Sequence, residues 1–416
     1  MAQRVVILGA GFAGMNVART LERHARRGEV TVTIVNRDNS LLFAPMLPEA
    51  SSGNVEPRHI APSLRSMLRR SVFEMGDVTD VDFVRRAVTL RRPRSDEATV
   101  LPFDQLVIAV GAENSTHGVP GAEAHTFPLK SLTDAVALRD VTITSLESAA
   151  SASDDASRRS LATFVIVGGG FTGVETAGEL LAYLRSAARF FPTIEVRDIR
   201  VILVAASDRL LEQLPASLGD SARRMLVERG VEVVLSDRVA SVDGSGISLS
   251  SGKRFESRCV VWSAGIRPAA LAAKLDLAHS AHAAIAVNAD LSVKHADGVW
   301  ALGDCAEIPE PGGGSYPQTA QHAVHEAKRL ALNLLARLRG RRTKPFVYRS
   351  RGMMASLGAR EGLADIGGRL LLSGLPAWLL WRAYYLWQLP RLDRKFRVGL
   401  DWALDFSFPH DIASVR

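Results

Sequence analysis

The sequence predicts an α/β fold that combines two Rossmann-like dinucleotide-binding domains with a helical C-terminal membrane-association segment. A strand–glycine turn–helix–strand pattern occurs twice, two further apolar strands end in glycine, and the C-terminal residues are rich in basic and aromatic side chains. The chain has 416 residues, of which 47% are hydrophobic and 23% are charged. This composition is ordinary for globular proteins, is sufficient for two or three domains, and excludes general disorder.

The first glycine pattern lies near the beginning of the sequence. An apolar strand at 5–8 leads into a GxGxxG turn, a helix is expected to follow as far as about Arg26, and 30–35 is the next strand. The glycines of this turn are Gly9, Gly11 and Gly14. The pattern therefore predicts one β–turn–α–β unit.

The same order of elements returns later in the chain. The apolar strand 164–167 leads into a second GxGxxG turn, a helix is expected as far as about Arg189, and 201–204 is again a strand. The glycines of the second turn are Gly168, Gly170 and Gly173. Repetition in the same structural context is a much stronger signal than one GxGxxG alone.

Each glycine of such a turn has its own physical role. The first permits the tight strand-to-helix turn, the second lets the backbone approach a pyrophosphate, and the third allows close packing of helix on strand. The pyrophosphate then lies at the free N–H groups and the positive end of the helix. Two copies therefore predict two dinucleotide sites, for a flavin and a nicotinamide cofactor. The alternative is a pair of tight turns without a ligand.

Two further apolar strands end where ligands bind in doubly wound sheets. The run 103–110 ends at Gly111, and 299–302 ends at Gly303 and Asp304. A carboxylate at the carboxyl end of a parallel strand lies at the usual position of a ligand. We therefore interpret Asp304 as a ligand-binding residue, with a helix N-cap or turn residue as the alternative.

Several connecting elements complete the predicted organisation. In the segment 231–261, turn residues at Asp243–Gly244 and Ser251–Gly252 separate short strands. The expected elements are a helix around 134–149, a polar linker over 151–160, short strands over 231–261 and a helix over 320–338.

The cysteine content excludes several kinds of chemistry. The two cysteines, Cys259 and Cys305, lie far apart and form neither a disulfide framework nor a C-x-x-C pair, so we expect no metal site and a reducing compartment. The N-terminal residues pass directly into a strand, which predicts no secretory signal. No uncharged apolar run reaches the length of a membrane-spanning helix.

The charge of the chain is concentrated in one segment. Residues 328–397 contain sixteen Lys or Arg and three acidic residues, a net charge of +13 in a chain whose net charge is +7. Such a segment indicates an anionic partner, which is either a membrane or a nucleic acid. It contains no recognised nucleic-acid-binding motif, so we expect no nucleic-acid partner.

The C-terminal segment also contains an aromatic helix. The run 377–389 is apolar, and four of the six tryptophans fall between 378 and 402. A thirteen-residue helix rises about 20 Å, which is too short to cross a hydrocarbon core of about 30 Å. Tryptophan and tyrosine beside arginine suit the headgroup level, so we predict a monotopic anchor. A helix packed on the protein's own core or in a dimer contact is the alternative.

These residues resemble the flavoprotein reductases with two dinucleotide-binding domains, and within them type II NADH dehydrogenase. The similarity covers nearly the whole chain. Its more specific motifs are Asn-Arg-Asp-Asn at 36–39, Leu-Phe-Ala-Pro-Met-Leu-Pro at 42–48, Phe-Thr-Gly-Val-Glu at 171–175, Thr-Ala-Gln-His-Ala-Val at 319–324, and the run 378–412 with Asp401-Trp402 and Phe408-Pro409.

The resemblance implies an FAD enzyme that takes hydride from NADH and passes two electrons to a membrane quinone without pumping protons. It implies a peripheral protein on the cytoplasmic face of the cell membrane and is compatible with a homodimer. The domains that it implies are 1–120 and 291–345 for FAD, 161–290 for NAD(P)H, 121–160 as connecting helix and linker, and 346–416 as the membrane-association segment. A soluble reductase with a protein electron acceptor is the alternative function.

The resemblance also assigns the site residues. Glu175 is placed at the nicotinamide–flavin junction, where it positions the cofactor or relays a proton. The alternative for Glu175 is an acid that stabilises a helix N-terminus. The FAD residues are Gly9, Gly11, Gly14, Asn36, Arg37, Val78, Gly111, Gly303, Asp304 and Ala320. The NAD residues are Gly168, Gly170, Gly173 and Gly265, and the quinone residues are Gln321 and His325.

Three positions depart from the family pattern. Asn36 replaces an acid that takes the ribose hydroxyls of FAD, although its amide can still form hydrogen bonds. Ala205 replaces the acid that pairs with the NADH 2′-hydroxyl and repels a 2′-phosphate, so NADPH is a further expected substrate. His325 replaces a glutamine of the quinone motif, and a histidine on the helix surface is its alternative reading.

Overall fold

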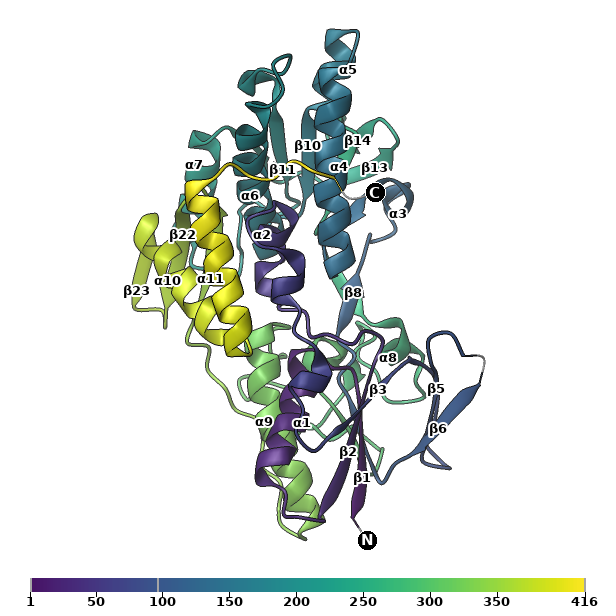
Figure 1. Ribbon diagram of the computed structural model, residues 1–416. Helices are drawn as coiled ribbons and strands as arrows, with labels where there is room; N and C mark the ends of the chain where they lie inside the picture. Colours follow the sequence, from purple (N-terminus) through teal and green to yellow (C-terminus); the bar gives the residue numbers. More distant parts are fainter. Residues whose placement is uncertain (1, 96, 415–416) are drawn as a thin grey trace. The chain divides into compact units, whose positions relative to one another are not determined.

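The computed structural model describes residues 2–95 and 97–414, which form two compact units (Figure 1). Unit 1 comprises the chain up to Leu41, together with Pro62–Glu113 and Ile266–Ser350. Unit 2 comprises Leu42–Ala61, Asn114–Gly265 and the chain from Arg351 onward. The sequence analysis did not foresee that the short stretch Leu42–Ala61 belongs to unit 2. The domain boundaries expected from the sequence stay a prediction.

Unit 1 is built on a five-stranded parallel sheet of order β19-β7-β1-β2-β3. Its strands are buried runs of valine, isoleucine and leucine, as expected for a parallel sheet that is covered on both faces. Helices α1 and α9 pack against each other (Figure 1). The bounds are β1 (Gln3–Leu8), α1 (Phe12–His24), β2 (Val30–Asn36), β3 (Val72–Met75), β7 (Gln105–Ile108), β19 (Val299–Ala301) and α9 (Ala320–Leu338).

Smaller elements complete unit 1. An antiparallel sheet β4-β5-β6 follows β3 in the chain, and the one-turn helix η5 follows β19. The bounds are η3 (Leu64–Ser66), β4 (Asp77–Asp82), β5 (Ala87–Arg91), β6 (Ala98–Pro102), β8 (Ala112–Asn114, which ends at the boundary with unit 2), β17 (Ile266–Pro268), α8 (Ala270–Lys274), β18 (Ile285–Ala286), η5 (Gly303–Cys305) and β20 (Ala306–Glu307).

Unit 2 contains a second five-stranded parallel sheet, of order β12-β11-β10-β16-β9. Helix α6 follows the glycine turn after β10 and is buried along most of its length. The bounds are η1 (Ala44–Met46), α2 (Leu47–Ser51), η2 (Pro57–Ile60), α3 (Ala122–His125), β9 (Phe127–Pro128), α4 (Leu132–Ala150), α5 (Asp155–Leu161), β10 (Thr163–Val167), α6 (Phe171–Ala188), η4 (Val196–Asp198), β11 (Arg200–Val204), α7 (Ala216–Glu228), β12 (Val231–Val234), β13 (Val239–Asp243), β14 (Gly246–Leu249), β15 (Arg254–Glu256) and β16 (Cys259–Trp262).

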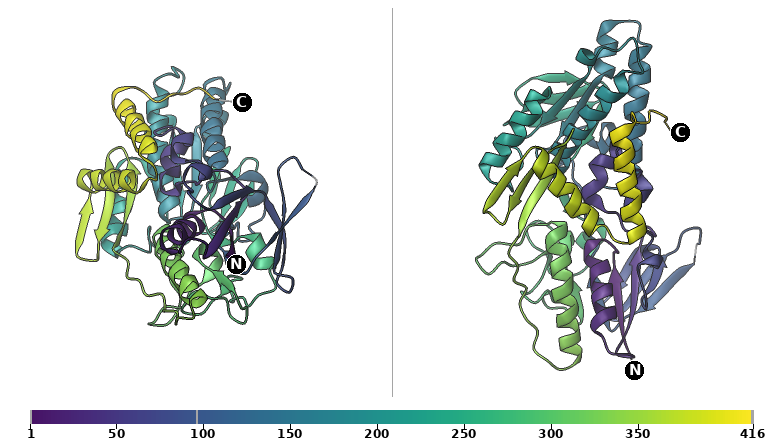
Figure 2. Two further views of the ribbon diagram at one scale, coloured as in Figure 1. Left: turned by 60° about the horizontal axis from the view of Figure 1, so that its bottom comes forward. Right: turned by 60° about the vertical axis from the view of Figure 1, so that its left-hand side comes forward.

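The C-terminal residues add a three-stranded antiparallel sheet and two helices to unit 2. Helix α10 packs on β21 and β22 (Figure 2). Its buried residues are Ala377, Trp378 and Trp381. The sequence predicts helix in this segment, and the three strands differ from that prediction. The bounds are β21 (Gly352–Gly358), β22 (Glu361–Ile366), β23 (Leu370–Ser373), α10 (Leu375–Gln388) and α11 (Leu392–Ser407).

The predicted α/β fold with two parallel sheets is confirmed, with small changes at the ends of elements. The first helix ends at His24 and the second at Ala188, close to the expected Arg26 and Arg189. The stretch 151–160, expected as a linker, contains most of α5. Over residues 2–95 and 97–414, no helix is long and apolar enough to cross a membrane.

Candidate functional site

The glycine turn of unit 1 has the geometry that its three roles require. Gly9 has φ +94°, and a Cβ added to it would overlap the carbonyl oxygen of Ala109. A Cβ added to Gly14 would overlap the carbonyl oxygen of Gly9, because α1 packs directly on the strand end. Gly11, the N-cap of α1, has no heavy atom within 4 Å of the added Cβ. The open space therefore lies at the position where a pyrophosphate must approach the backbone.

The glycine turn of unit 2 repeats this arrangement. Gly168 has φ +125° and is crowded by Ser263, and a Cβ added to Gly173 would overlap the carbonyl oxygen of Gly168. Gly170, the N-cap of α6, again faces open space. Both turns thus fit the dinucleotide class of ligand by their free volume as well as by their sequence.

Polar groups in unit 1 surround the first turn. The Oδ1 atom of Asn36 accepts a hydrogen bond from the N–H of Ala10 at 2.9 Å, and its Nδ2 atom donates to the carbonyl of Asp38 at 2.8 Å. Asn36 therefore stabilises the turn with one accepted and one donated hydrogen bond. An ionised acid could form only the accepted one. Arg37 is exposed and forms an ion pair with Asp77 at 2.9 Å, and Val78 follows in β4.

A second part of the unit 1 site lies at the ends of β7 and β19. Gly111, with φ +69°, faces open space, and Gly303 begins the one-turn helix that holds Asp304. A Cβ on Gly303 would lie 3.2 Å from Ala13 of α1. The buried carboxyl of Glu326 accepts the N–H of Gly303 at 2.8 Å. Glu326 thereby holds this backbone in place.

Glu326 was not identified from the sequence. Burial raises the pKa of Glu326 to about 7, against the opposing effect of the hydrogen bond from Gly303. The available signal was an acid four positions after His322 on the apolar face of α9. A buried acid of this kind indicates that the residues around Gly303 and Asp304 are arranged for more than packing.

The expected quinone residues lie on the first turns of α9, which begins at Ala320. The hydroxyl of Ser350 is 3.2 Å from the Oε1 atom of Gln321. The ring of His325 stacks on that of Tyr348, with 4.1 Å between ring centroids and 21° between planes. Both residues are half-buried, so each keeps part of its surface for a ligand.

At the end of β11, where the sequence analysis expects the adenosine of the nicotinamide cofactor, position 205 is an alanine. Ala205 follows β11 and is 2% exposed, and its carbonyl accepts the N–H of Asp237 at 3.3 Å. The Arg209 side chain donates to the carbonyl of Glu212 at 3.0 Å. Gly265, also expected near the nicotinamide cofactor, has φ +82°, and an added Cβ would overlap the ring of His117. The side chain at position 205 therefore carries no charge that would repel a 2′-phosphate, as an aspartate or glutamate would.

Glu175 is buried and does not act as a helix cap. The N-cap of α6 is Gly170, and the first turn of the helix contains no acid. Instead, the Oε1 atom of Glu175 accepts the backbone N–H of Ser356 in β21 at 3.0 Å. Burial raises the pKa of Glu175 well above its usual range, and the nearby Glu179 and Glu49 raise it further. The alternative reading as a helix-terminus residue is therefore wrong.

Further buried charges surround Glu175. Glu49 of α2 lies 3.4 Å from the Nη2 atom of Arg382, and the indole of Trp402 donates to Glu49 at 3.2 Å. The Arg382 guanidinium lies between two indoles, 4.1 Å from the ring centroid of Trp378 and 4.5 Å from that of Trp402. These contacts fix α10 and α11 to α2 through a charge that is shielded from water.

Sequence reasoning missed Glu49, Glu179 and Arg382. One signal was available for Glu179, because Glu175 and Glu179 are four positions apart in an otherwise apolar helix and therefore share its buried face. The partners of Glu49 come more than 330 positions later, and no local pattern relates them.

The thiols and metal-binding side chains offer no separate chemistry. Both cysteines are buried, and burial raises the pKa of Cys305 to about 11 and that of Cys259 to about 12. Thiols of this kind are poor nucleophiles at neutral pH. In the part of the chain that the structure describes, no group of three His, Cys, Asp or Glu side chains could hold a metal ion.

Comparison with known proteins defines the class. The family model of pyridine nucleotide-disulphide oxidoreductases matches residues 3–327. The structure of NDH2 from Plasmodium falciparum in complex with NADH matches 99% of this chain and 100% of that one, with a TM-score of 0.92 and 19% identity. The fold is thus that of the pyridine nucleotide-disulphide oxidoreductases.

Curated relatives narrow the assignment. Type II NADH:quinone oxidoreductase NdhA of Mycobacterium tuberculosis is 32% identical over 97% of this chain and 87% of its own length. Demethylphylloquinone reductase NdbB of Synechocystis sp. is 31% identical over 96% of this chain and 95% of its own. The chain belongs to the type II NADH:quinone oxidoreductases, and the predicted family and enzyme class are confirmed.

The glycine turn of unit 1 generates a test that separates ligand binding from folding. Gly11→Val places its side chain in open space, so we expect a folded protein that does not retain FAD. Gly14→Val forces α1 away from β1 and should lower the thermal unfolding midpoint. The measurements are the flavin absorbance of purified protein and its melting curve. A yellow Gly11→Val protein with a wild-type flavin content would contradict the assignment of this turn.

Proposed function

We propose that this member of the family is a peripheral membrane enzyme that binds FAD in unit 1 and NADH in unit 2, and reduces a membrane quinone. The observation that carries the proposal is the geometry that the two glycine turns share. In each turn the first and third glycines are packed against neighbouring atoms, and the glycine at the helix N-cap faces open space. The alternative, a soluble reductase with a protein electron acceptor, predicts no quinone activity. Titration of the purified protein with NADH and NADPH, with and without a quinone analogue, tests the proposal against it.

The residues around the first turn would hold FAD. The N–H groups at the start of α1 would bind its pyrophosphate, and Asn36, Arg37 and Val78 would bind its adenosine part. Gly111, Gly303, Asp304 and Ala320 would form the part of the site toward the flavin ring. The bound flavin supplies the redox chemistry, since it takes a hydride and passes on two electrons. The protein supplies position and protons.

The residues around the second turn would hold the nicotinamide cofactor. The open position at Gly170 would receive the pyrophosphate at the N-terminus of α6. Gly265 is also proposed to contact the nicotinamide cofactor. At Ala205 there is no carboxylate, so the penalty against NADPH is small. NADH then loses a hydrogen-bond acceptor at the same place. We expect both cofactors to be accepted, with NADH slightly preferred.

Ala205→Glu tests this selectivity. The new carboxylate accepts a hydrogen bond from the 2′-hydroxyl of NADH and repels the 2′-phosphate of NADPH. A hydrogen bond to a charged group contributes about 1.5–3 kcal/mol, and each ~1.4 kcal/mol is tenfold. The NADH-to-NADPH ratio of kcat/KM should therefore rise about tenfold or more. Strong rejection of NADPH by the wild-type protein would show that another residue sets the selectivity.

Glu175 is proposed as the residue that supplies a proton. Its Oε1 atom is already an acceptor for Ser356, so a proton on this carboxyl sits on Oε2. Its raised pKa favours the protonated form of the carboxyl, which is the form that a donor needs. The other role that the family resemblance allows, positioning the cofactor, requires no particular protonation state.

Glu175→Gln distinguishes these roles. Glutamine keeps the acceptor for Ser356 and the shape of the side chain but carries no transferable proton. We expect a normal flavin content, a normal KM for NADH, and a kcat lowered about 100-fold, the lower end of a general-acid contribution. Steady-state kinetics and the flavin spectrum measure these quantities. Wild-type turnover in this variant would remove Glu175 from the reaction.

Gln321 and His325 are proposed to face the quinone. An imidazole N–H and an amide N–H both donate hydrogen bonds of the kind that a quinone carbonyl accepts. The stacking of His325 on Tyr348 holds the imidazole plane in one orientation. Supporting this proposal are the half-buried position of both side chains and their place on the first turns of α9.

The C-terminal helices are proposed to lie on the cytoplasmic face of the membrane. Helix α11 exposes four apolar side chains that are each four residues apart, the spacing of one helix face. They are Leu392 (72% exposed), Phe396 (79%), Leu400 (59%) and Leu404 (47%). Arg391 and Arg397 are exposed at the same end of the helix, where anionic headgroups would meet them. Helix α10 fits both interpretations of the aromatic run. It packs Trp378 and Trp381 on the protein's own core, and it exposes Trp387, as a membrane anchor would.

Binding to vesicles tests this surface. Phe396→Ser removes an exposed apolar side chain whose full burial contributes about 1.5–3 kcal/mol. We expect the partition coefficient for vesicles of mixed neutral and anionic phospholipid to fall about tenfold, as 1.4 kcal/mol implies. Val84→Ser, which changes a 96% exposed valine between β4 and β5, is the matched control. Equal binding by both variants and the wild type would reject the anchor.

A further inference from the structure

Glu179 is a buried acid that the proposed function leaves without a role. It lies one helical turn after Glu175 on α6 and is 2% exposed. The Nδ2 atom of Asn54 donates to its Oε2 atom at 2.7 Å. The hydroxyl of Ser356 bonds to its Oε1 atom at 2.9 Å. Its carboxyl is therefore held in one orientation from two sides.

Ser356 connects the two carboxyl groups. Its backbone N–H donates to Glu175 at 3.0 Å while its hydroxyl bonds to Glu179, and the residue itself is 1% exposed. The two acids thus share one partner in a region without bulk water. Because charges interact strongly in such surroundings, a change in the protonation of one carboxyl is felt by the other.

The charges around this pair come from several elements. Glu49 on α2 and Asp405 on α11 are further acids. Arg229, which caps the C-terminus of α7, and Arg382 on α10 are the cations that act on Glu179. Tyr385 on α10 also faces Glu175. The four acids outnumber the two arginines. Burial, as the largest cause, raises the pKa of both Glu175 and Glu179. Both shifts favour the protonated forms of these carboxyls.

A second polar neighbour of Glu175 comes from α10. Trp381 is 1% exposed, and its indole N–H lowers the pKa of Glu175. Burial opposes this effect and is the larger of the two. The carboxyl of Glu175 is therefore approached by the indole of Trp381 as well as by the backbone N–H of Ser356.

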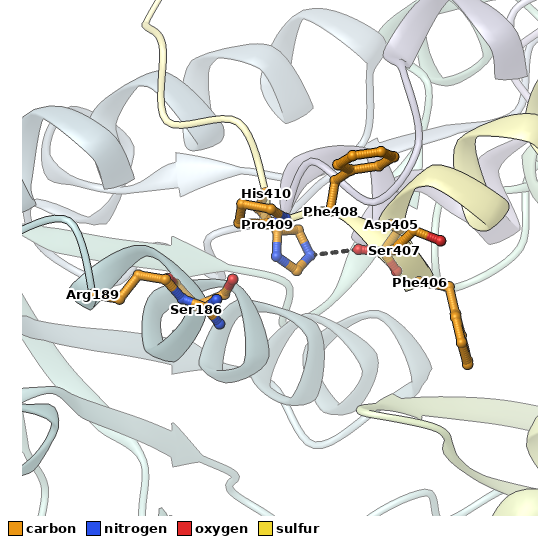
Figure 3. A pocket seen from close by; sticks show the side chains of 8 residues that line it. All are labelled: Ser186, Arg189, Asp405, Phe406, Ser407, Phe408, Pro409 and His410. Carbon is orange, nitrogen blue, oxygen red and sulfur yellow. Dashed lines mark hydrogen bonds and ion pairs between the residues drawn. The ribbon is translucent and has the colours of Figure 1, made fainter.

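The pair is also connected to a pocket. The Oδ1 atom of Asn54 accepts a hydrogen bond from Nε2 of His410 at 2.6 Å, and the same nitrogen lies 2.8 Å from Asp405. His410 and Asp405 line a pocket of about 340 Å³ (Figure 3). The amide of Asn54 does not itself pass a proton on, so its role is to hold Glu179 at the inner end of this network.

We propose that Glu179 is a positioning residue that acts through Ser356 to set the protonation of Glu175, and that the two share the one proton that each turnover takes from the medium. The inference rests on the proposed role of Glu175 as proton donor. NADH and quinone react with one proton to give NAD⁺ and quinol. The hydride brings one hydrogen nucleus and both electrons, so the second hydrogen of the quinol is that proton.

Glu179→Gln tests the inference. Glutamine can bond to Asn54 and Ser356 but removes the negative charge that opposes ionisation of Glu175. Glu175 should then lose its proton at lower pH. We expect the basic limb of the kcat–pH profile to move down by about one unit, the typical size of shift from a neighbouring charge. KM for NADH should not change. Glu228→Gln, at an exposed glutamate of α7, is the matched control.

Infrared spectroscopy gives a second readout that does not depend on turnover. The carbonyl band of protonated carboxylic acid, titrated in the resting enzyme, should disappear at lower pH in Glu179→Gln than in the wild type.

Ser356→Ala keeps the N–H to Glu175 but removes the hydroxyl that lowers the pKa of Glu179. Glu179 then stays neutral to higher pH, and the profile should shift in the same direction by a smaller amount. Ser356→Thr should restore it.

The outcomes separate this inference from the proposed function. If Glu175→Gln slows turnover but Glu179→Gln and Ser356→Ala leave the pH profile and the infrared titration unchanged, the role of Glu179 is wrong and that of Glu175 stands. If Glu175→Gln turns over at the wild-type rate, the proposed role of Glu175 fails with it. A shift in Glu228→Gln equal to that in Glu179→Gln would also overturn the inference, since it would reflect overall charge.

Discussion

Direct contact between helix and strand at the third glycine of each turn is the constraint on which both units depend. At Gly14 and Gly173 the helix backbone lies against the carbonyl oxygen of the first glycine of the same turn, and a single added carbon would separate them. This contact places the N-terminus of α1 at the end of β1 and the N-terminus of α6 at the end of β10. The free N–H groups of both helices are therefore presented at the edge where doubly wound sheets bind ligands.

Most of the two parallel sheets follows from local sequence. Their strands are buried on both faces, so runs such as 5–8 and 164–167 are continuously apolar, and the glycines beside them mark the turns. The strands β21–β23 were missed because they contain several glycines and lack a clear alternation of polar and apolar residues. The placement of Leu42–Ala61 in unit 2 was missed because its partners, α4, α6 and α11, are far from it in the chain.

The roles of site residues could be predicted from the sequence only for residue types, such as glycine, that serve a single purpose in a motif. Glycine at fixed spacing could be assigned because space alone decides its function. Glu175 was found through its motif, but its burial and its bond to Ser356 depend on a strand that was not foreseen. Asn36 departs from the expected acid, and the structure shows why an amide serves, since it both accepts from Ala10 and donates to Asp38.

The order of the segments along the chain has a consequence for biosynthesis. Both units are assembled from early and late stretches, so neither is complete until the last third of the polypeptide has left the ribosome. Glu49 is made near the beginning, whereas Arg382 and Trp402, which satisfy it, are made near the end. At ribosomal rates of about 5–20 residues per second, the wait lasts roughly 20–70 s. Nascent chains of this protein therefore expose incomplete units for longer than chains whose domains are contiguous.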